Sequence, residues 1–296
     1  MLRIIPGEIV HPKLHQYLLG SVAPRPIAFA STVDAKGNPN LSPFSFFNVF
    51  GVNPTTLIFS PSLRGRDGST KNTLENIKVV PEVVINVVTF DMVNQVSLAS
   101  TEYPAGVDEF LKAGFSKIPS ELIRPFRVKE SPVQMECRVR DIMETGSGGG
   151  AANLIICEIL LMHIREDILG DDGMIDQQKI RLVGRLGKDY YVKAFGDALF
   201  EVEKPLQRKG IGIDALPEKI RNSHILTGND LGQLGNVESL PGVEEIRAFL
   251  KNPEIKELIE TSSDISTELH RLALNYLQTG HAYEALKLLM LINLLN

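Results

Sequence analysis

Residues 27–47 read IAFASTVDAKGNPNLSPFSFF, and this stretch predicts the β-hairpin from which the rest of the fold can be read. It divides into a strand over 27–33, a turn over 34–40 and a second strand over 41–47. The strand segments are rich in apolar and β-branched or aromatic residues, and Gly37 lies among the polar residues typical of turns. Pro43 places the second strand at a sheet edge or a bulge, because proline has no N–H for the ladder.

The first two-thirds of the chain continues this β pattern, with short helices between strands. Further strands are predicted at residues 56–60, 83–88, 133–139 and 154–163. The nearly continuous apolar run at 83–88 predicts burial on both faces. Helices are predicted at 72–79 and at 107–113, where Gly114 closes the second, and residues 146–150 (GSGGG) predict a flexible connection. Short strands without βαβ alternation favour a barrel or a sandwich over a doubly wound sheet.

The last third of the chain changes to a helical pattern. We therefore place a boundary near residue 200, with a mainly β domain over 1–200 and an α-helical extension over 201–296. Apolar residues at helical spacing predict one helix over 265–277 and another over 283–295, with Gly280 between them. The second helix is apolar nearly all round, so it must be buried. The helical region either covers an apolar face of the β domain or extends a dimer interface, or it forms a lid or partner site.

Composition limits the classes of function. The chain has 296 residues, 43% of them hydrophobic, and a net charge of -5, which argues against a nucleic-acid-binding protein. No apolar run is long enough to span a membrane, and the first residues do not resemble a secretory leader. Cys137 and Cys157 lie in apolar runs without metal spacing, so we expect buried, reduced thiols in a cytoplasmic protein.

The loop over residues 62–73, SLRGRDGSTKNT, is the first candidate binding segment. It carries Arg64, Arg66 and Lys71 together with hydroxyl side chains, and it leads into the helix predicted at 72–79. A helix N-terminus beside cations and hydroxyls is an anion site, so a phosphate fits here. Asn72 followed by Glu75 resembles a capping box. The alternative is a solvated surface loop with a good N-cap, and no P-loop motif is present.

The aromatic stretch over residues 42–48, SPFSFFN, is the second candidate. On a strand, Phe44 and Phe46 share one face, while Ser45 and Phe47 share the other, so one face can line a flat aromatic ligand. The alternative is simple core packing. The hydroxyls of Ser31 and Thr32 at the end of the first strand are weaker candidates, since such groups often only satisfy the backbone.

The histidines show no catalytic or metal-binding pattern. His11 and His15 lie on a possible first helix and His163 ends a strand, and no pair has the spacing of metal ligands. We expect structural or surface roles for them and no metal site. Hydrolase and dinucleotide-binding fingerprints are absent from the sequence as well.

Taken in order, these segments resemble the flavin reductase-like proteins with an FMN-binding split barrel, a group that includes flavoredoxin-like proteins. The resemblance covers about residues 20–195 and not the C-terminal region. The segments that carry it are residues 23–28 (APRPIA), 31–34 (STVD), 42–48 (SPFSFFN), 70–76 (TKNTLEN) and 107–110 (VDEF).

The resemblance implies a six-stranded antiparallel split barrel that forms a homodimer, with FMN near the dimer interface. It places Lys71, Asn72 and Thr73 at the FMN phosphate, and Ser60 and Ser62, with Arg64 or Arg66 nearby, at the phosphate or the ribityl chain. By the same resemblance, Ser45, Phe46, Phe47 and Asn48 contact the isoalloxazine ring, and Ser31 and Thr32 lie beside it. No catalytic residue is implied, since hydride transfer requires no acid or base from the protein.

The implied activity is that of an FMN-dependent oxidoreductase, most simply an NAD(P)H:flavin reductase that passes electrons to an acceptor the sequence does not identify. Many reductases of this family have a histidine just before the strand that begins here near Asn153, whereas this chain has Ala151 and Ala152. This departure concerns nicotinamide use and leaves the expected FMN contacts intact. The alternatives are a non-catalytic FMN-binding electron carrier whose helical tail docks a partner, and a barrel that binds another anion.

Overall fold

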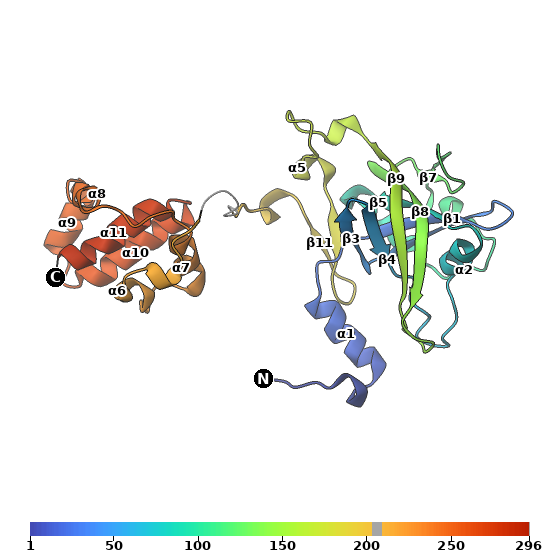
Figure 1. Cartoon of the computed structure of the whole chain (residues 1–296), viewed down its shortest axis with the longest axis horizontal. Helices are drawn as coiled ribbons and strands as arrows, with labels where there is room; N and C mark the ends of the chain where they lie inside the picture. The colour runs from blue at the N-terminus through green and yellow to red at the C-terminus, as the bar shows by residue number, and fades with distance from the viewer. Residues whose placement is uncertain (203–208, 296) are drawn as a thin grey trace. The chain divides into compact units, whose positions relative to one another are not determined.

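The computed structural model describes residues 1–202 and 209–295 of the chain. Two units can be distinguished, Met1–Phe200 and Glu201–Asn296 (Figure 1). Each unit has hydrophobic clusters built from its own residues alone. The mainly β architecture with short helices, followed by C-terminal helices, confirms the fold class predicted from the sequence.

The first unit is built on a seven-stranded antiparallel sheet in the order β2-β1-β5-β8-β9-β4-β3. Its strands are β1 (Ala28–Val33), β2 (Pro39–Phe44), β3 (Phe47–Val52), β4 (Thr55–Phe59), β5 (Glu82–Val87), β8 (Val133–Glu144) and β9 (Asn153–Ile164). The long strands β8 and β9 pair along most of their length, as Figure 1 shows. The predicted strands at 27–33, 56–60, 83–88, 133–139 and 154–163 all correspond to strands of this sheet.

The strand predicted at 41–47 is wrong in its bounds, and the expected number of six strands is too low. Strand β2 ends at Phe44 and a separate strand, β3, begins at Phe47. The chain changes direction between them, and the Phe46 carbonyl accepts a hydrogen bond from the N–H of Ser60 at 2.9 Å. Strand β3 gave no periodic signal because most of its apolar residues are exposed on an edge strand that also contains Gly51.

The turn between β1 and β2 forms as its sequence predicts. The Asp34 carboxylate accepts hydrogen bonds from the N–H groups of Lys36 at 2.8 Å and Asn38 at 2.9 Å. Gly37 takes a φ of 84°, a conformation that favours glycine. These local contacts fix the register that pairs Thr32 with Asn40 across the hairpin.

Strand β1 is buried on both faces, which explains its uninterrupted apolar sequence. Ala28 and Ala30 belong to one hydrophobic cluster, and Phe29 between them belongs to another. Helix α2 (Asn72–Val79) contributes buried apolar residues to the first cluster, and α4 (Glu109–Ala113) contributes Phe110 to the second. Strand β5 has a buried central run, which confirms the double burial predicted for it.

The two cysteines lie in the first cluster, and both are free and buried, as predicted. Burial raises the pKa of the Cys157 thiol to about 12. It also raises the pKa of Cys137. Since the thiolate is the reactive form, these residues act as core packing groups and not as nucleophiles.

Smaller elements complete the first unit. They are the helices α1 (His11–Ser21), α3 (Val93–Leu98) and α5 (Gln177–Ile180), and the two-stranded sheets β6 (Lys117–Ile118) with β7 (Arg127–Val128) and β10 (Val183–Arg185) with β11 (Tyr191–Lys193). None of the residues of α1 is buried. Helix α4 lies within the predicted segment 107–113 and ends at Gly114, whose φ of 72° closes it as expected.

The second unit is helical. Its helices are α6 (Glu218–Arg221), α7 (Gly228–Gly235), α8 (Val243–Phe249), α9 (Pro253–Thr261), α10 (Ile265–Gln278) and α11 (Ala282–Leu294). Helices α10 and α11 match the two predicted C-terminal helices. Helix α11 contacts α7, α8 and α10, and its apolar residues are buried in the core of this unit. The burial that its sequence requires is therefore met inside the second unit. No helix in the described residues is long and apolar enough to cross a membrane.

Candidate functional site

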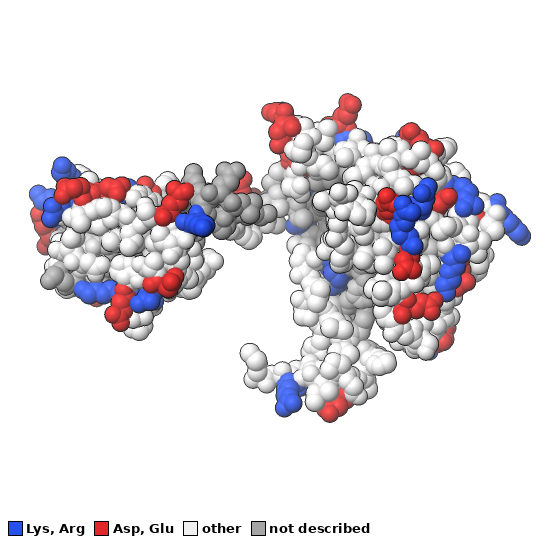
Figure 2. All heavy atoms as spheres, in the orientation of Figure 1, with Lys and Arg blue, Asp and Glu red and all other residues white. Residues whose placement is uncertain are grey.

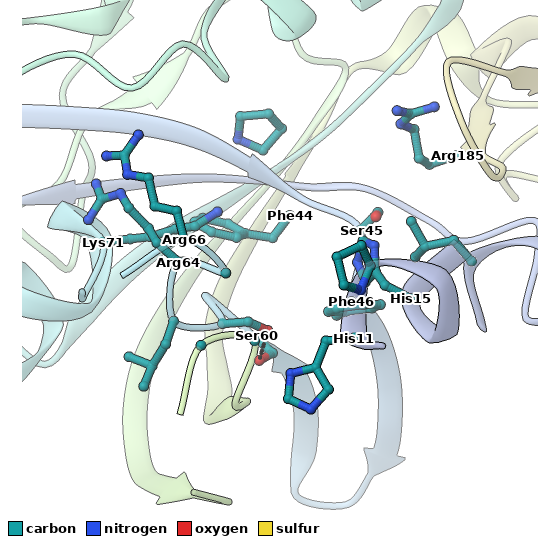
Figure 3. A pocket seen from close by; sticks show the side chains of 18 of the residues that line it. His11, His15, Phe44, Ser45, Phe46, Ser60, Arg64, Arg66, Lys71 and Arg185 are labelled. Atoms are coloured by element: carbon teal, nitrogen blue, oxygen red, sulfur yellow. Dashed lines mark hydrogen bonds between the residues drawn. The ribbon is translucent and has the colours of Figure 1, made fainter. Parts of the chain in front are cut away.

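A cavity of about 770 Å³ opens in the first unit between helix α1 and the sheet. Its walls come from α1, the β2–β3 connection, the loop that follows β4, the start of α2, the β8–β9 loop and strand β10. Figure 3 shows cationic side chains gathered at one end, Phe44 and Phe46 further along, and Arg185 at the other end. The cavity therefore brings together segments that lie near the beginning and near the end of this unit in the sequence.

Three cations and one carboxylate form the first end of the cavity, which we call the cationic end: Arg64, Arg66, Lys71 and Glu102. Arg64 Nε donates to Glu102 Oε1 at 3.0 Å, and Arg66 Nη1 lies 2.9 Å from Glu102 Oε2. Glu102 offsets one positive charge, and Asp67, whose Oδ2 lies 3.1 Å from Arg66 Nε, offsets another, so this end keeps a surplus of one positive charge. Such a surplus beside hydroxyl donors suits a phosphate group.

Lys71 is the least compensated of these cations. Its Nζ lies 5.3 Å from the centre of the Phe44 ring. Burial, together with the charge of Arg64, lowers the pKa of the Lys71 ammonium. An anion held beside Lys71 would oppose both causes, since it stabilises the charged form. The geometry thus supports the anion site predicted in this loop.

The N-terminus of α2 differs from the predicted capping box. Lys71 is the N-cap residue, with an extended backbone, and Asn72 is the first residue of the helix. No side chain caps this end by a hydrogen bond. Instead, the Lys71 carbonyl accepts from the N–H groups of Leu74 at 2.9 Å and Glu75 at 3.2 Å. The sequence showed a helix start here, but the backbone conformation places it one residue earlier.

Asn72 and Thr73 do not line the large cavity. They line a smaller one of about 70 Å³, and Lys71 and Arg64 border both cavities. The Thr73 hydroxyl donates to Asn40 Oδ1 at 2.9 Å, and it is almost completely buried. Thr73 therefore helps to fix α2, and through it Lys71, against strand β2.

Ser31 and Thr32 also lie outside both cavities, and both are fully buried. The Thr32 hydroxyl accepts from Asn76 Nδ2 at 3.1 Å, which ties β1 to α2. The Ser31 hydroxyl has no hydrogen-bond partner within the described residues. We predicted that both residues lie beside the flavin ring. Neither side chain is exposed to the cavity, because other elements cover both faces of β1.

A buried carboxylate completes this polar region. Glu109 accepts from Asn40 Nδ2 and from the Leu41 N–H, both at 3.0 Å. Burial raises the pKa of Glu109, although these hydrogen bonds act in the opposite direction. Glu109, Asn40 and Thr73 form one continuous network that links α4, β2 and α2. This network positions the helix start that carries Lys71.

Ser60 and Ser62 line the large cavity at its lower wall, as Figure 3 shows for Ser60. Their hydroxyls lie 3.4 Å apart, and Ser60 Oγ accepts from the N–H of Asn153 at 3.2 Å. The Asn153 side chain also donates to the Pro61 carbonyl at 3.1 Å. The start of β9 thus holds this loop in place, and the serine hydroxyls are available to a ligand.

The aromatic stretch divides between the core and the cavity. Ser45 and Phe46 line the cavity, and Phe46 is 43% exposed. Phe47 packs against the first hydrophobic cluster, and Asn48 is exposed on β3, so neither lines the cavity. The predicted division into two strand faces is wrong, because residues 45 and 46 lie in the connection between β2 and β3.

Five charged or titratable residues that line the cavity were not among the predicted binding residues: His11, His15, Arg25, Glu102 and Arg185. His11 and His15 are one helical turn apart on α1, and the centres of the His15 and Phe46 rings lie 6.5 Å apart with the rings nearly perpendicular. Their spacing was the one available signal. Arg25 lies within the APRPIA segment, whereas nothing near Arg185 indicated a site.

The β8–β9 loop makes a close approach to the cationic end. A Cβ added at Gly149 would lie 2.8 Å from the Gly65 carbonyl oxygen and 3.0 Å from that of Arg64. Backbone hydrogen bonds join Leu63 to Gly150 at 3.0 Å and to Ala151 at 2.9 Å. The segment expected to be a flexible connection is therefore a fitted wall of the cavity, and Gly149 is required for the fit.

We expect Gly149→Ala to displace the loop that carries Arg64 and to weaken binding of any ligand at the cationic end. The clash is with backbone atoms, which cannot rotate away as a side chain can. Gly148→Ala is the matched control, since a Cβ there meets no atom within 4 Å. Titration of FMN into both variants measures the effect, and equal affinities would contradict it.

Within the described residues, no group of three or more His, Cys, Asp or Glu side chains is arranged to hold a metal ion. His163 instead bonds Glu136 Oε1 at 2.8 Å, away from the cavity. Glu136 is fully buried and also accepts from the N–H groups of Glu121 at 2.9 Å and Leu122 at 2.7 Å. The role of His163 is thus structural, as expected.

Comparison with known proteins agrees with this architecture. An uncharacterized protein from Halalkalibacterium halodurans is 32% identical over 206 residues, which cover 69% of this chain and 97% of that protein. One from Aquifex aeolicus is 35% identical over 189 residues, which cover 64% of this chain and 94% of that protein.

Two solved structures show the likeness in three dimensions. Nitrilotriacetate monooxygenase component B from Bacillus cereus has a TM-score of 0.63 and 28% identity, covering 68% of this chain and 98% of its own. A putative flavin reductase with a split barrel domain, from Shewanella frigidimarina, has a TM-score of 0.58 and 22% identity, covering 69% of this chain and 100% of its own. The second comparison shows the fold alone, and it confirms the predicted split barrel.

Residues 19–181 match the sequence family described as the flavin reductase like domain. This match covers more than half of the chain and lies entirely in the first unit. It includes Arg64, Lys71 and the aromatic stretch that line the cavity. The chain therefore belongs to the flavin reductase-like domain family.

Proposed function

We propose that this protein is an FMN-dependent oxidoreductase, most simply an NAD(P)H:flavin reductase. The observation that supports the proposal most strongly is the cavity itself, which combines a cationic end with an aromatic surface in a flavin reductase-like domain. A flavin mononucleotide has the matching halves, a phosphate and a flat aromatic ring. The donors present thus suit FMN.

In this proposal each part of the cavity has a separate task. Arg64 and Lys71 neutralise the phosphate, and the hydroxyls of Ser60 and Ser62 donate to it or to the ribityl chain. Ser45 and Phe46 hold the ring from the β2–β3 connection. When bound, FMN supplies the capacity to accept a hydride and pass electrons on. The protein orients the ring and excludes water from its buried side, and no side chain need transfer a proton.

An absorbance spectrum of the purified protein tests this proposal, recorded with added FMN before and after NADH under anaerobic conditions. Bleaching of protein-bound flavin by NADH is the expected result. A flavin-loaded protein that stays oxidised with both NADH and NADPH would contradict the reductase assignment. Failure to bind FMN would contradict the flavin assignment as a whole.

A non-catalytic electron carrier is the second candidate function, and two features favour it. The chain has Ala151 and Ala152 where many reductases of this family carry a histidine. It also has a second unit with a hydrophobic core of its own, beyond the matched segment. In this case the second unit docks a redox partner, and flavin binds without turnover of nicotinamide. The spectrum separates the two candidates.

The proposal includes a homodimer in the cytoplasm, without nucleic acid or membrane as partner. Strand β3 is an edge strand on which Val49, Phe50 and Val52 are exposed, and apolar edge strands are usually covered. The two free, buried cysteines suit a reducing compartment.

We expect Phe50→Glu to convert the dimer into a monomer, because it places a charge in the covered apolar surface. The control is Val79→Glu, which charges an equally exposed apolar position on α2. Sedimentation velocity of wild type and both variants gives the mass. A wild-type protein with the mass of one chain, or a Phe50→Glu variant that remains a dimer, would contradict this interface.

A further inference from the structure

The cavity has a second positively charged end, formed by Arg25 and Arg185. Figure 3 shows Arg185 at the opposite end from Arg64, Arg66 and Lys71, with Ser45, Phe46 and His15 close to that opposite end. One phosphate group requires only one of the two ends. The second end therefore calls for a separate explanation.

Strand pairing brings the two arginines together. Arg25 and Arg185 form an isolated antiparallel bridge, with backbone hydrogen bonds of 3.0 and 2.8 Å between them. The charge of Arg185 adds to the effect of burial and lowers the pKa of the Arg25 guanidinium. Within the described residues, neither arginine has a carboxylate partner, whereas Glu102 pairs with both arginines at the cationic end.

The two arginines nevertheless differ in how their donors are used. Arg25 donates to the carbonyls of Leu19 at 2.8 Å, Val22 at 2.7 Å and Leu186 at 2.9 Å, so it fastens the end of α1 to the loop after β10. Within the described residues, Arg185 makes one side-chain hydrogen bond, to the Tyr190 carbonyl at 2.9 Å. Arg185 thus keeps most of its donors for a ligand.

Arg185 is also held in place. Its guanidinium carbon lies 4.7 Å from the centre of the Tyr191 ring, the geometry of a cation–π contact. Arg185 and Ser45 line the same cavity, and a fixed guanidinium together with a hydroxyl is suited to a planar or tetrahedral oxyanion.

We propose that Arg185 and Ser45 form a subsite for the oxyanion group of the second substrate, the molecule that exchanges electrons with the flavin. The inference rests on the proposed function, since it assumes that the flavin phosphate occupies the cationic end. The oxyanion is a phosphate of a dinucleotide donor or the carboxylate of an aromatic acceptor. Arg185 lies outside residues 19–181, so the subsite is a feature that the family match does not include.

Direct binding of two simple anions tests the subsite. Inorganic pyrophosphate and benzoate are each titrated by calorimetry into the FMN-loaded protein, and pyrophosphate represents the donor while benzoate represents the acceptor. We expect at least one of them to bind, and Arg185→Met to weaken that binding about tenfold, as loss of a charge-assisted hydrogen bond predicts. Arg185→Lys should retain part of the affinity, because it keeps the charge.

Arg181→Met is the matched control. Its guanidinium also lies over aromatic rings, 5.1 Å from the centre of Phe195 and 5.5 Å from that of Phe90, but it does not line the cavity. FMN affinity should be the same in wild type and both methionine variants. Anion binding that is independent of Arg185, or absent altogether, would overturn the proposal. So would an Arg185→Met variant that loses FMN affinity, since the group would then contact the flavin.

The design separates this proposal from the proposed function. If NADH is oxidised and pyrophosphate is the anion that binds through Arg185, Arg185→Met should raise the KM for NADH. The kcat of the variant should stay within about twofold of the wild-type value. If NADH is not oxidised but an anion binds through Arg185, the subsite stands and the reductase assignment fails. If FMN does not bind, the same titrations on the purified chain still report on Arg185.

Discussion

Replacing Lys71 by methionine should weaken FMN binding about tenfold to a hundredfold. Lys71 is the one cation at the cationic end without a carboxylate within salt-bridge distance in the described residues, and it is the N-cap residue of α2. Loss of a hydrogen bond to a charged group costs about 1.5–3 kcal/mol, and each 1.4 kcal/mol is about a factor of ten in affinity. Methionine keeps the aliphatic packing on Phe44 and removes only the charge.

Lys78→Met provides the matched comparison, because Lys78 lies on the same helix, is exposed and pairs with Glu144 at 3.1 Å. Fluorescence titration of FMN into the three proteins gives the dissociation constants. Wild-type affinity should also fall with added salt more steeply than that of Lys71→Met. Equal affinities for Lys71→Met and wild type would show that the phosphate does not bind at this end of the cavity.

Thr73 is better tested by stability than by affinity. Its hydroxyl is almost fully buried against Asn40, so it supports α2 and does not face the large cavity. The resemblance drew attention to the segment that holds Lys71 and Thr73. It did not distinguish Lys71, which lines the cavity, from Thr73, which fixes the helix. The difference depends on the direction in which each side chain points from the folded backbone.

The sequence predicted best those features that depend on neighbouring residues. The turn closed by Asp34 and Gly37 forms from contacts within five residues, so its composition is sufficient. The helix start at residues 71–72 was visible for the same reason. The cap itself was assigned one residue too late, since Asn72 can act as a cap in an isolated peptide but lies inside the first helical turn here.

Features created by distant contacts were not predictable in the same way. Arg25 and Arg185 meet through strand pairing, and neither segment alone indicates the second positive end. Strand β3 escaped detection because most of its apolar residues are exposed and do not alternate with polar ones. Gly149 was read as part of a flexible connection, although only the folded chain brings it against the backbone of Gly65.

Glu136→Ala should have the largest effect on stability, lowering the free energy of unfolding by about 3 kcal/mol. The fully buried carboxylate accepts from two backbone N–H groups, those of Glu121 and Leu122, and from His163. Removing the acceptor leaves His163 and the part-buried N–H groups of Glu121 and Leu122 without this partner, at a cost of about 1 kcal/mol each. Glu158→Ala is the control, because this carboxylate pairs with the exposed Arg140 on the adjacent strand and should contribute at most about 1 kcal/mol.

The effect of Glu136 should also depend on pH, in a direction fixed by its pKa. Burial acts to raise the pKa of Glu136, but the hydrogen bonds from Glu121, Leu122 and His163 outweigh it and hold the pKa below its ordinary value of 4.5. The folded state therefore binds this proton less readily than the unfolded state. The stabilisation is complete above pH 4.5 and is lost as the pH falls through the folded pKa.

Urea unfolding of wild type, Glu136→Ala, Glu136→Gln and Glu158→Ala between pH 3 and pH 7 measures both the loss of stability and this dependence. Glutamine retains the shape and one acceptor oxygen but cannot ionise, so the difference in stability from wild type should shrink as the solution is acidified below about pH 4.5. A constant difference across this range would mean that the charge of Glu136 does not stabilise the fold. A Glu136→Ala variant no less stable than Glu158→Ala would show that its three donors find other partners, and would contradict the prediction.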